Sequence, residues 1–484
     1  MTLIEIKIPK EVRDYHETIF FGLNTRQFIC SLLALGVAVG VYFLLRPLLG
    51  TEEVGWVCIL AAAPFAACGF FSYHSMTAEQ LFWAWCKSEL LSPKRLVYRY
   101  NSYYYDAIQG GMRMKKPKQM YYGQNAVSKN RIVVDRRQLL NGNSFRLGVS
   151  GSGKSMSAKE EIAQIALSTE DDILILDVES EFGHLVEAFG GEVIRISATS
   201  DTHINALDMD RAYGDERNPI VSKSEFVLSL FEQLIGSGLV TAKEKSILGR
   251  CTEQVYMPYV RNGYKGAVPT LKDFYRLLKM QPEPEAQGLA LSSELFITGT
   301  LGTFAQPTNV DTKAQIIAYD IRELGEQLMP IGMLVTLDAI YNRVIQNWKR
   351  GHRTWIFCDE FYILFRYEYS ANFFYKLWKR IRKYNGLITG MTQNVDELLR
   401  SDTARLMLAN SEFLIMLNQS ATDREELAKL LNISDTQLGY ITNVPAGCGL
   451  IRCAGNLVPF TNSFPRNTQL YRLMTTKPDE QLKG

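Results

Sequence analysis

Residues 148–155 read GVSGSGKS, which is the G-x-x-x-x-G-K-S pattern of a phosphate-binding P-loop. Glycines in such a loop let backbone N–H groups curl closely around phosphate oxygens. Lys154 would place its ammonium group at the β- and γ-phosphates, and the Ser155 hydroxyl would ligate Mg²⁺. The helix expected over residues 155–167 points its positive end at the same phosphates. The predicted nucleotide contacts are Gly148, Ser150, Gly151, Ser152, Gly153, Lys154, Ser155 and Met156.

Short apolar runs alternate with helical patterns on both sides of this motif. Strands are expected at residues 132–134, 145–147, 173–177, 193–196, 315–320, 354–358, 387–391 and 412–416. Helices are expected at residues 155–167, 328–350, 374–384 and 421–431, with a helical insertion at about 219–280 and a terminal hairpin over 447–452 and 456–461. This alternation predicts an α/β fold, in which helices cover a mostly parallel sheet and ligands bind at the carboxyl ends of its strands.

Two further motifs follow predicted strands. The apolar run at residues 354–358 ends in Asp359 and Glu360, where the aspartate would hold Mg²⁺ and the glutamate would polarise the attacking water. The alternative is a strand that ends at a solvated acidic turn. Gln393 comes directly after another strand and would sense the γ-phosphate or position water, unless it only caps a turn.

Arginines could complete the site from a neighbouring subunit. Such a residue would reach the γ-phosphate bound by the next copy of the chain. Arg380 and Arg382 are the candidates, and Arg400 and Arg424 rank below them. The alternative is that the basic face of the helix at residues 374–384 is simply solvated.

Two apolar runs near the N-terminus, at about residues 28–45 and 54–73, contain no charged side chain. Each approaches the ~20 residues that a membrane-spanning helix needs. Lysines and arginines flank the pair on both outer sides, which predicts a multi-pass protein of the cell membrane with both termini in the cytoplasm. The alternative is a buried helical hairpin in a soluble domain.

The chain divides into four predicted parts. Residues 1–107 form the membrane domain, 108–120 a basic linker, 121–478 the nucleotide-binding domain in the cytoplasm, and 479–484 a tail. Aromatic and basic residues at 98–105 suit the membrane surface and its lipids, and single-stranded DNA is the alternative partner. The eight cysteines are expected to be free thiols, and the net charge of +2 argues neither for nor against a polyanionic partner.

The N-terminal part resembles the PrgI-like small membrane proteins of Gram-positive conjugative elements. The matching phrases are IEIKIPKEVRDYHETIFFGLNTRQ before the apolar runs and MTAEQLFWAWCKSELLSPKRLVYRYNSYYY after them. Such proteins are regarded as counterparts of the small inner-membrane subunit of type IV secretion systems. The resemblance therefore implies a membrane protein that works beside other secretion subunits.

Residues from about 122 to 478 resemble the C-terminal motor domain of VirB-type traffic ATPases of type IV secretion, in the HerA/FtsK-like branch of P-loop ATPases. The matching phrases are YGQNAVSKNRIVVDRR, LGVSGSGKSMSAKEEI, ILDVESEFGHLV, INALDM, WIFCDEFYILF, YNGLITGMTQNVDELL and SEFLIMLNQSATDREELAKLL. The resemblance assigns roles to Lys154, Ser155, Asp359, Glu360 and Gln393, and places Glu181 near the nucleotide. It implies a hexamer. The extensive N-terminal domain usual in this family is replaced here by the PrgI-like part.

These patterns together predict a membrane-tethered, Mg²⁺-dependent ATPase with a RecA/FtsK-like P-loop fold. It would hydrolyse ATP to power type IV secretion or conjugative transfer, with other secretion subunits, membrane lipids and copies of itself as partners. One alternative is a DNA-pumping translocase like a coupling protein. Another is a non-catalytic scaffold that nucleotide binding merely orders.

Overall fold

The computed structural model describes residues 18–20, 23–70, 72–73, 76–77, 119–214, 218–236, 238–366 and 368–477. The predicted tail at 479–484, and all but the last two residues of the linker predicted at 108–120, lie outside this range. The chain divides into two compact units, Met1–Gly111 and Met112–Gly484. Each unit is described by itself.

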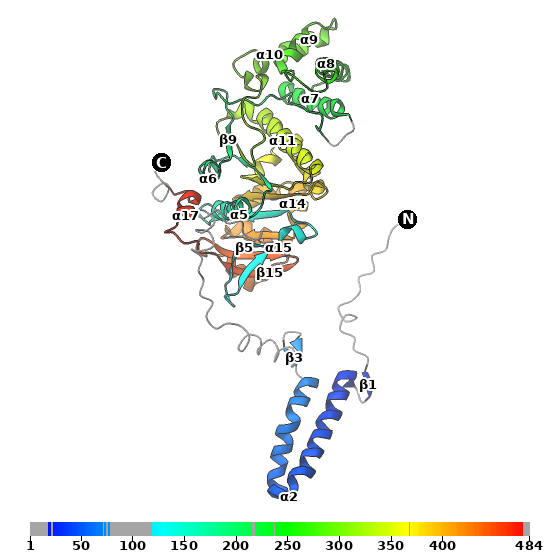
Figure 1. The fold of residues 1–484 in the computed structure, drawn as a ribbon, viewed down its shortest axis with the longest axis vertical. Helices are drawn as coiled ribbons and strands as arrows, with labels where there is room; N and C mark the ends of the chain where they lie inside the picture. The colour runs from blue at the N-terminus through cyan, green and yellow to red at the C-terminus, as the bar shows by residue number, and fades with distance from the viewer. Residues whose placement is uncertain are drawn as a thin grey trace. The chain divides into compact units, whose positions relative to one another are not determined.

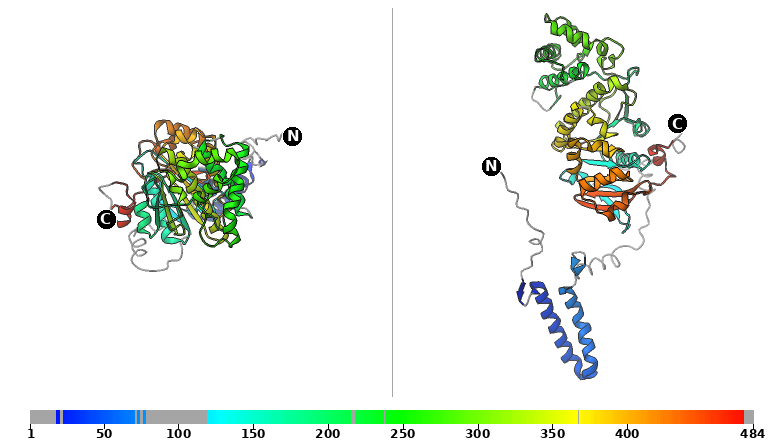
Figure 2. Two further views of the ribbon diagram at one scale, coloured as in Figure 1. Left: turned by 90° about the horizontal axis from the view of Figure 1, so that it is seen from above. Right: turned by 180° about the vertical axis from the view of Figure 1, so that it is seen from behind.

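The first unit is built around α2 (Thr25–Phe70), which folds back so that two helical arms lie side by side (Figure 1, Figure 2). Its short strands are β1 (Thr18–Phe20), β2 (Leu23–Asn24), β3 (Ser72–Tyr73) and β4 (Met76–Thr77). The stretch Gln27–Pro47 is long and apolar enough to cross a membrane, and Val54–Cys68 is a shorter apolar helix. The second apolar run was expected to stay helical to residue 73, but the helix ends at Phe70 because the chain turns into β3.

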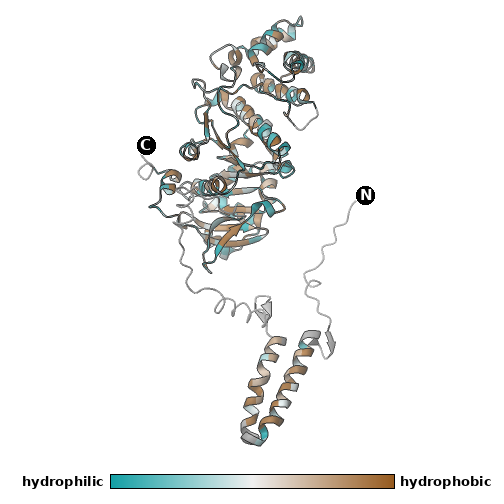
Figure 3. Cartoon of the chain, viewed as in Figure 1, coloured by the Kyte–Doolittle hydropathy of each residue, from teal (hydrophilic) through white to brown (hydrophobic). Residues whose placement is uncertain are grey.

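The arms of α2 consist largely of hydrophobic residues (Figure 3), and many of their apolar side chains are exposed. Leu35, Leu44 and Leu60 are 66%, 72% and 73% exposed. A helix whose apolar residues face outward in this way matches a lipid environment, where every backbone polar group is satisfied within the helix. Exposure of these leucines therefore indicates membrane association.

The second unit is organised by one sheet, in which the described residues form eleven strands in the order β6-β5-β15-β14-β13-β7-β12-β11-β8-β10-β9. The strands from β13 to β9 run parallel, and β14, β15, β5 and β6 extend the sheet with antiparallel pairing. Their bounds are β5 Met120–Asn125, β6 Arg131–Val134, β7 Ser144–Leu147, β8 Asp172–Asp177, β9 Glu192–Arg195, β10 Ile316–Asp320, β11 Thr354–Cys358, β12 Gly386–Thr392, β13 Phe413–Met416, β14 Cys448–Cys453 and β15 Asn456–Thr461. The predicted mostly parallel α/β sheet is confirmed.

Helices follow the parallel strands and cover both faces of the sheet. They are α5 (Lys154–Ser168), α6 (Gly183–Ala188), α11 (Gly325–Lys349), α12 (Glu368–Arg380), α13 (Val395–Leu399), α14 (Asp402–Ala409), α15 (Ala421–Leu431), α16 (Asp435–Leu438) and α17 (Gln469–Met474). Short 3₁₀ segments are η2 (Arg136–Gln138), η3 (Gly302–Ala305), η4 (Phe361–Phe365) and η5 (Gly439–Ile441). Alternate residues of β7 contact opposite faces, because Phe145 stacks on Trp378 of α12 while Arg146 bonds Ser157 of α5.

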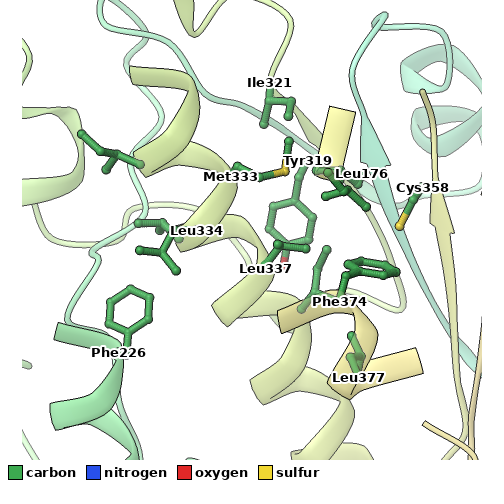
Figure 4. Close-up of a cluster of buried hydrophobic side chains, with 14 of the residues drawn as sticks. Leu176, Phe226, Tyr319, Ile321, Met333, Leu334, Leu337, Cys358, Phe374 and Leu377 are labelled. Atoms are coloured by element: carbon green, nitrogen blue, oxygen red, sulfur yellow. The ribbon is translucent and has the colours of Figure 1, made fainter. Parts of the chain in front are cut away.

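The core lies between the sheet and α11 (Figure 4). Leu334 and Leu337 of α11 lie among Phe226, Tyr319 and Phe374, which come from different elements. Although α11 is apolar and long enough to span a membrane, its most apolar window is 72% buried inside the unit. It is therefore a core helix of this domain.

The helical insertion lies between β9 and β10 and is longer than predicted. It comprises α7 (Pro219–Ile235), α8 (Ala242–Arg261), α9 (Leu271–Lys279) and α10 (Pro284–Ile297), so it extends beyond the expected end at about residue 280. Pro284 begins α10, where its fixed φ and missing N–H are tolerated at a first turn. The first strand of the sheet, β5, begins at Met120, one residue before the predicted start of the nucleotide-binding domain.

Candidate functional site

The P-loop connects β7 to α5. Gly151 and Gly153 have φ values of 74° and 98°, in the left-handed region that side chains disfavour. A Cβ added to Gly148 would lie 2.5 Å from the Ser152 hydroxyl oxygen and 3.0 Å from the Leu417 Cβ, so this position leaves little room for a side chain. The loop is fastened from outside, since the Val149 N–H donates to the Asn418 carbonyl at 2.9 Å.

The polar groups of this loop are left available for a ligand. Within the described residues, the Lys154 ammonium makes no hydrogen bond or ion pair, although the residue is only 7% exposed. The Ser152 hydroxyl oxygen is buried and has no partner there either. Ser155 and Met156 follow Lys154 in the first turn of α5. Because buried polar groups are normally paired, these orphans fit a triphosphate.

Sheet order brings the second and third motifs to the same edge as the P-loop. β12 lies between β7 and β11, with Leu147 opposite Thr392 and Gly390 opposite Cys358. Gln393 and Asp359 each come directly after one of these parallel strands. The carboxyl ends of three adjacent strands therefore carry the P-loop, the glutamine and the acidic pair.

Glu360 occupies a strained and buried position. Its φ and ψ of 41° and 53° lie in the left-handed region, which is costly for a non-glycine residue and is concentrated at functional sites. Burial raises the pKa of its carboxyl, and the nearby Lys154 charge and the backbone N–H of Gln393 partly oppose that rise. One carboxylate oxygen, Oε2, is buried without a partner among the described residues. This carboxylate is thus held beside Lys154 and Gln393 and is free to accept a proton.

Asp359 shares this environment. Burial raises its pKa to about 8, helped by the negative charges of Glu360, Glu181 and Asp177 and opposed by Lys154. Its backbone N–H donates to the Leu176 carbonyl at 3.0 Å, which fixes it against β8. A buried carboxyl that repels its neighbours in the empty site would gain most from a bound cation.

Sequence reasoning gave no role to Asp177, which lies at the carboxyl end of β8. Its carboxylate accepts the N–H groups of Glu181 and Phe182 at 3.0 and 2.9 Å, and burial raises its pKa to about 6. Asp320 of β10 lies opposite it in register and accepts the Ser180 hydroxyl at 2.6 Å. The feature of the sequence that could have pointed to Asp177 is its place as an acid at the end of an apolar run. Asp177 positions the turn that carries Glu181, whose Oε2 is buried without a partner in the described chain.

A cavity of about 390 Å³ opens beside the P-loop. Its walls combine loop residues with the segments after β12 and β13: Val149, Ser150, Gln393, Asn394, Asp396, Glu397, Arg400, Ser420, Thr422 and Asp423. Arg400 pairs with Asp396 at 2.9 Å and is largely exposed. The cavity thus joins the predicted Ser150 and Gln393 contacts to the start of α13.

The predicted arginines lie in different places. Arg382 donates to the Leu140 carbonyl at 2.6 Å, just before β7, so it lies at the amino edge of the parallel strands. Arg380 ends α12 close to it and is exposed. Both are therefore at the edge opposite the P-loop of their own chain. Arg424 donates to the Thr442 hydroxyl at 3.2 Å. Only Arg400 among the four lines the cavity beside the P-loop.

A Mg²⁺ site would be completed by the substrate. Within the described residues, no group of three or more histidine, cysteine or acidic side chains is arranged to hold a metal by itself. Mg²⁺ in nucleotide sites is typically held by one or two protein groups together with phosphate oxygens. Ser155 and the electrostatically stressed Asp359 fit that pattern.

Comparison with known families matches two parts of the chain. Residues 7–98 match the PrgI family, and residues 308–446 match the TraG P-loop domain. The second match includes Asp359, Glu360 and Gln393. No curated protein sequence matches the chain. These findings confirm the two-part resemblance that the sequence motifs indicated.

Solved structures share the architecture of the second unit. VirB4 of Thermoanaerobacter pseudethanolicus aligns with a TM-score of 0.58 and 22% identity, over 72% of this chain and 96% of that chain. The plasmid coupling protein TrwB, in complex with ADP and Mg²⁺, aligns with a TM-score of 0.44 and 15% identity, over 74% of this chain and 92% of that chain. The VirB4 likeness confirms the predicted P-loop ATPase fold.

Proposed function

We propose that the chain is a membrane-associated, Mg²⁺-dependent ATPase of a conjugative type IV secretion system. The observation that carries the proposal is the meeting of Lys154 with Glu360 at one edge of the sheet. Lys154 is 7% exposed and its ammonium is unpaired among the described residues, while Glu360 is strained and one of its carboxylate oxygens is buried without a partner there. The two groups have opposite chemical tasks, which are to bind phosphate and to take a proton. The PrgI and TraG P-loop matches support the secretion role.

Each residue would act on a defined part of the reaction. Lys154 would hold the β- and γ-phosphates, while the backbone N–H groups of residues 148–153 surround them. Ser155 and Asp359 would hold Mg²⁺, which when bound neutralises phosphate charge. Glu360 would orient and polarise the attacking water, and Gln393, whose backbone N–H contacts the Glu360 carboxylate, would sense the γ-phosphate.

The rest of the chain would place this motor at the inner face of the cell membrane. The lysines and arginines that flank the apolar arms favour a multi-pass topology with both termini and the ATPase domain in the cytoplasm. Other secretion subunits, lipids and further copies of the chain, in a hexamer, would be the partners, and single-stranded DNA is a further candidate. An arginine from a neighbouring copy, Arg380 or Arg382 by the sequence, would complete the site.

Phosphate release by the detergent-solubilised full chain tests the activity. We expect hydrolysis that needs Mg²⁺, falls by two or more orders of magnitude in Lys154→Ala and Glu360→Gln, and persists in the matched exposed substitutions Lys279→Ala and Glu253→Gln of the insertion. Glu360→Gln should still bind ATP. Equal phosphate release from wild type and both site variants would instead indicate the non-catalytic scaffold.

The same assay separates the motor from a DNA pump. A rate per subunit that rises with protein concentration supports catalysis across subunits. Stimulation by single-stranded DNA, together with strand movement, would favour the translocase over the traffic ATPase.

A further inference from the structure

A buried charge cluster lies beneath the P-loop helix, on the face of the sheet that α5 covers. It consists of Arg136, Arg146, Glu161 and Tyr122, each less than 5% exposed. Arg136 comes from η2, Arg146 from β7, Glu161 from α5 and Tyr122 from β5. Four elements that surround the P-loop therefore meet in one polar network.

Glu161 is the shared acceptor of this cluster. Its two carboxylate oxygens accept from Arg136 Nη1 at 2.9 and 3.0 Å, and they also accept from Arg146 Nη2 and from the Tyr122 hydroxyl. The two guanidinium groups hold the pKa of Glu161 below its usual value against the effect of burial. Burial and the Glu161 charge raise the pKa of Tyr122, so the phenol stays neutral. The cluster thus contains two positive charges and one negative charge.

All three guanidinium nitrogens of Arg136 donate hydrogen bonds within the protein, so this side chain links neighbouring elements. Besides Glu161, its guanidinium donates to the Gly142 carbonyl at 2.8 Å, the Ile388 carbonyl at 3.1 Å and the Thr389 hydroxyl at 2.9 Å. Its Cζ atom also lies 5.4 Å from the centre of the Trp355 ring. These contacts tie η2 to β12 and β11, away from the first turn of α5.

Arg146 shares Glu161 with Arg136 but differs from it in its other partners and in its position. It lies in β7, two residues before Gly148, and its Nη1 donates to the Ser157 hydroxyl in the first turn of α5. Its Nε is buried without a partner among the described residues. The Arg146–Ser157 hydrogen bond, called the hook below, therefore joins the strand that enters the P-loop to the helix that leaves it. The guanidinium that makes this bond keeps one N–H without an acceptor among the described residues.

A buried arginine with an unpaired N–H is not explained by folding stability alone. Replacing buried ion pairs by apolar residues of similar size often leaves a protein equally stable or more stable. An excess positive charge below the start of α5 becomes favourable when a polyanion binds above it, because low-polarity surroundings screen the attraction weakly. The site above is the one assigned to a triphosphate.

We propose that Arg146 is a positioning residue for nucleotide binding, which hooks β7 to Ser157 and supplies uncompensated positive charge beneath the P-loop. The inference rests on the proposed function, because it concerns affinity for the same nucleotide. It predicts that breaking the hook impairs ATP binding more than it impairs folding. Thr389 gives the control, since its hydroxyl accepts from Arg136 in the same network but belongs to β12 rather than α5; it is 1% exposed, whereas Ser157 is half-buried.

Titration calorimetry with ATP, on the solubilised full chain, measures the effect, and thermal unfolding without nucleotide measures stability. We expect Ser157→Ala to weaken ATP binding about tenfold, as for loss of a hydrogen bond to a charged group, and Thr389→Val to bind like wild type with a similar loss of thermal stability. Arg146→Lys keeps the positive charge but loses the branched guanidinium, so its ATP affinity should lie between those of wild type and Ser157→Ala.

Two outcomes would overturn the inference. One is wild-type ATP affinity in Ser157→Ala, and the other is equal weakening of ATP binding by Thr389→Val, which would make the cluster a purely structural network. A wild-type chain whose ATP binding matches that of Lys154→Ala would point to a different failure, that of the proposed function itself.

Discussion

At the scale of single residues, Asp359 shows how this site trades stability for ligand binding. The carboxyl is 3% exposed, and its pKa of about 8 reflects burial and repulsion by Glu360, Glu181 and Asp177. In the unfolded chain the same group would titrate near 3.8. The folded protein therefore binds a proton that the unfolded chain releases over most of this range.

The sign of the pH dependence follows from that difference. Stability from this group is complete below about pH 4 and is lost as the pH rises toward 8. The side chain in Asp359→Asn does not titrate. The free energy of unfolding of this variant, relative to that of wild type, should therefore rise by roughly 1 kcal/mol per pH unit from pH 4 to pH 8, and the difference should stay constant above pH 8. The same variant should lose ATP hydrolysis, because the metal ligand is gone.

Chemical denaturation of the nucleotide-free protein between pH 5 and 9 checks this expectation. Asp201→Asn, at an exposed position, serves as the control and should track wild type at every pH. A stability difference between Asp359→Asn and wild type that does not change with pH would contradict the environment assigned to this carboxyl.

At the scale of elements, the helical insertion is held to the core helix α11 by a buried ion pair. Lys223 of α7 is fully buried, and its Nζ lies 3.0 Å from Asp338 of α11. The Tyr213 hydroxyl donates to the same carboxylate at 2.7 Å, and the ammonium lies 4.2 Å from the centre of the Phe226 ring. Burial lowers the pKa of Lys223, and Asp338 opposes that fall. This contact anchors α7 to the core helix.

Lys223→Ala should therefore be strongly destabilising. Removing one partner of a buried pair leaves the other charge uncompensated, at a cost of about 3–5 kcal/mol. Lys245→Ala is the matched control, because Lys245 makes an ion pair of similar length with Glu232, at 2.8 Å, but lies half-exposed on the surface. That control should cost about 0–1 kcal/mol. Equal denaturation midpoints for the two variants would show that the insertion does not depend on this anchor.

The elements that could be located from the sequence are those with a clear apolar pattern. β8 and β11 contain the continuous apolar runs at residues 173–176 and 355–358, as buried parallel strands should. β5 was not predicted as a strand, because its sequence MYYGQN contains polar residues and a glycine. In the structure this glycine, Gly123, has a φ of 130°. α12 begins at Glu368, six residues before the predicted start, and ends at Arg380. The strand order of the sheet depends on distant contacts and was not readable from local patterns.

Site residues were predictable to the extent that motifs fix them. The P-loop and the Asp359-Glu360 pair have characteristic spacing and follow strands, so their meeting at one edge could be anticipated. The amino-edge location of Arg380 could also have been derived, because a helix that joins two parallel strands returns to their amino ends. Arg146 and Glu161 were not recognised, since one charge inside a strand and another inside a helix have no shared pattern until the fold pairs them.

At the scale of the whole molecule, the two units depend on different surroundings. The second unit has its own core, built from the sheet and the buried face of α11, while the arms of α2 present apolar side chains outward. The division between the units falls at Gly111 and Met112. A helical arm that faces lipid and a unit with its own apolar core need no shared packing to be stable.

Deleting residues 1–111 should therefore separate attachment from nucleotide chemistry. We expect residues 112–484 to remain soluble without detergent, to keep the unfolding midpoint of the second unit, and to bind ATP as the full chain does, because the P-loop and its supporting cluster lie wholly in that unit. Flotation with phospholipid vesicles should recover the full chain and leave the truncated chain at the bottom of the gradient. Loss of ATP affinity in soluble, folded residues 112–484 would show that the first unit shapes the site, and flotation of that fragment would place a membrane-binding surface outside α2.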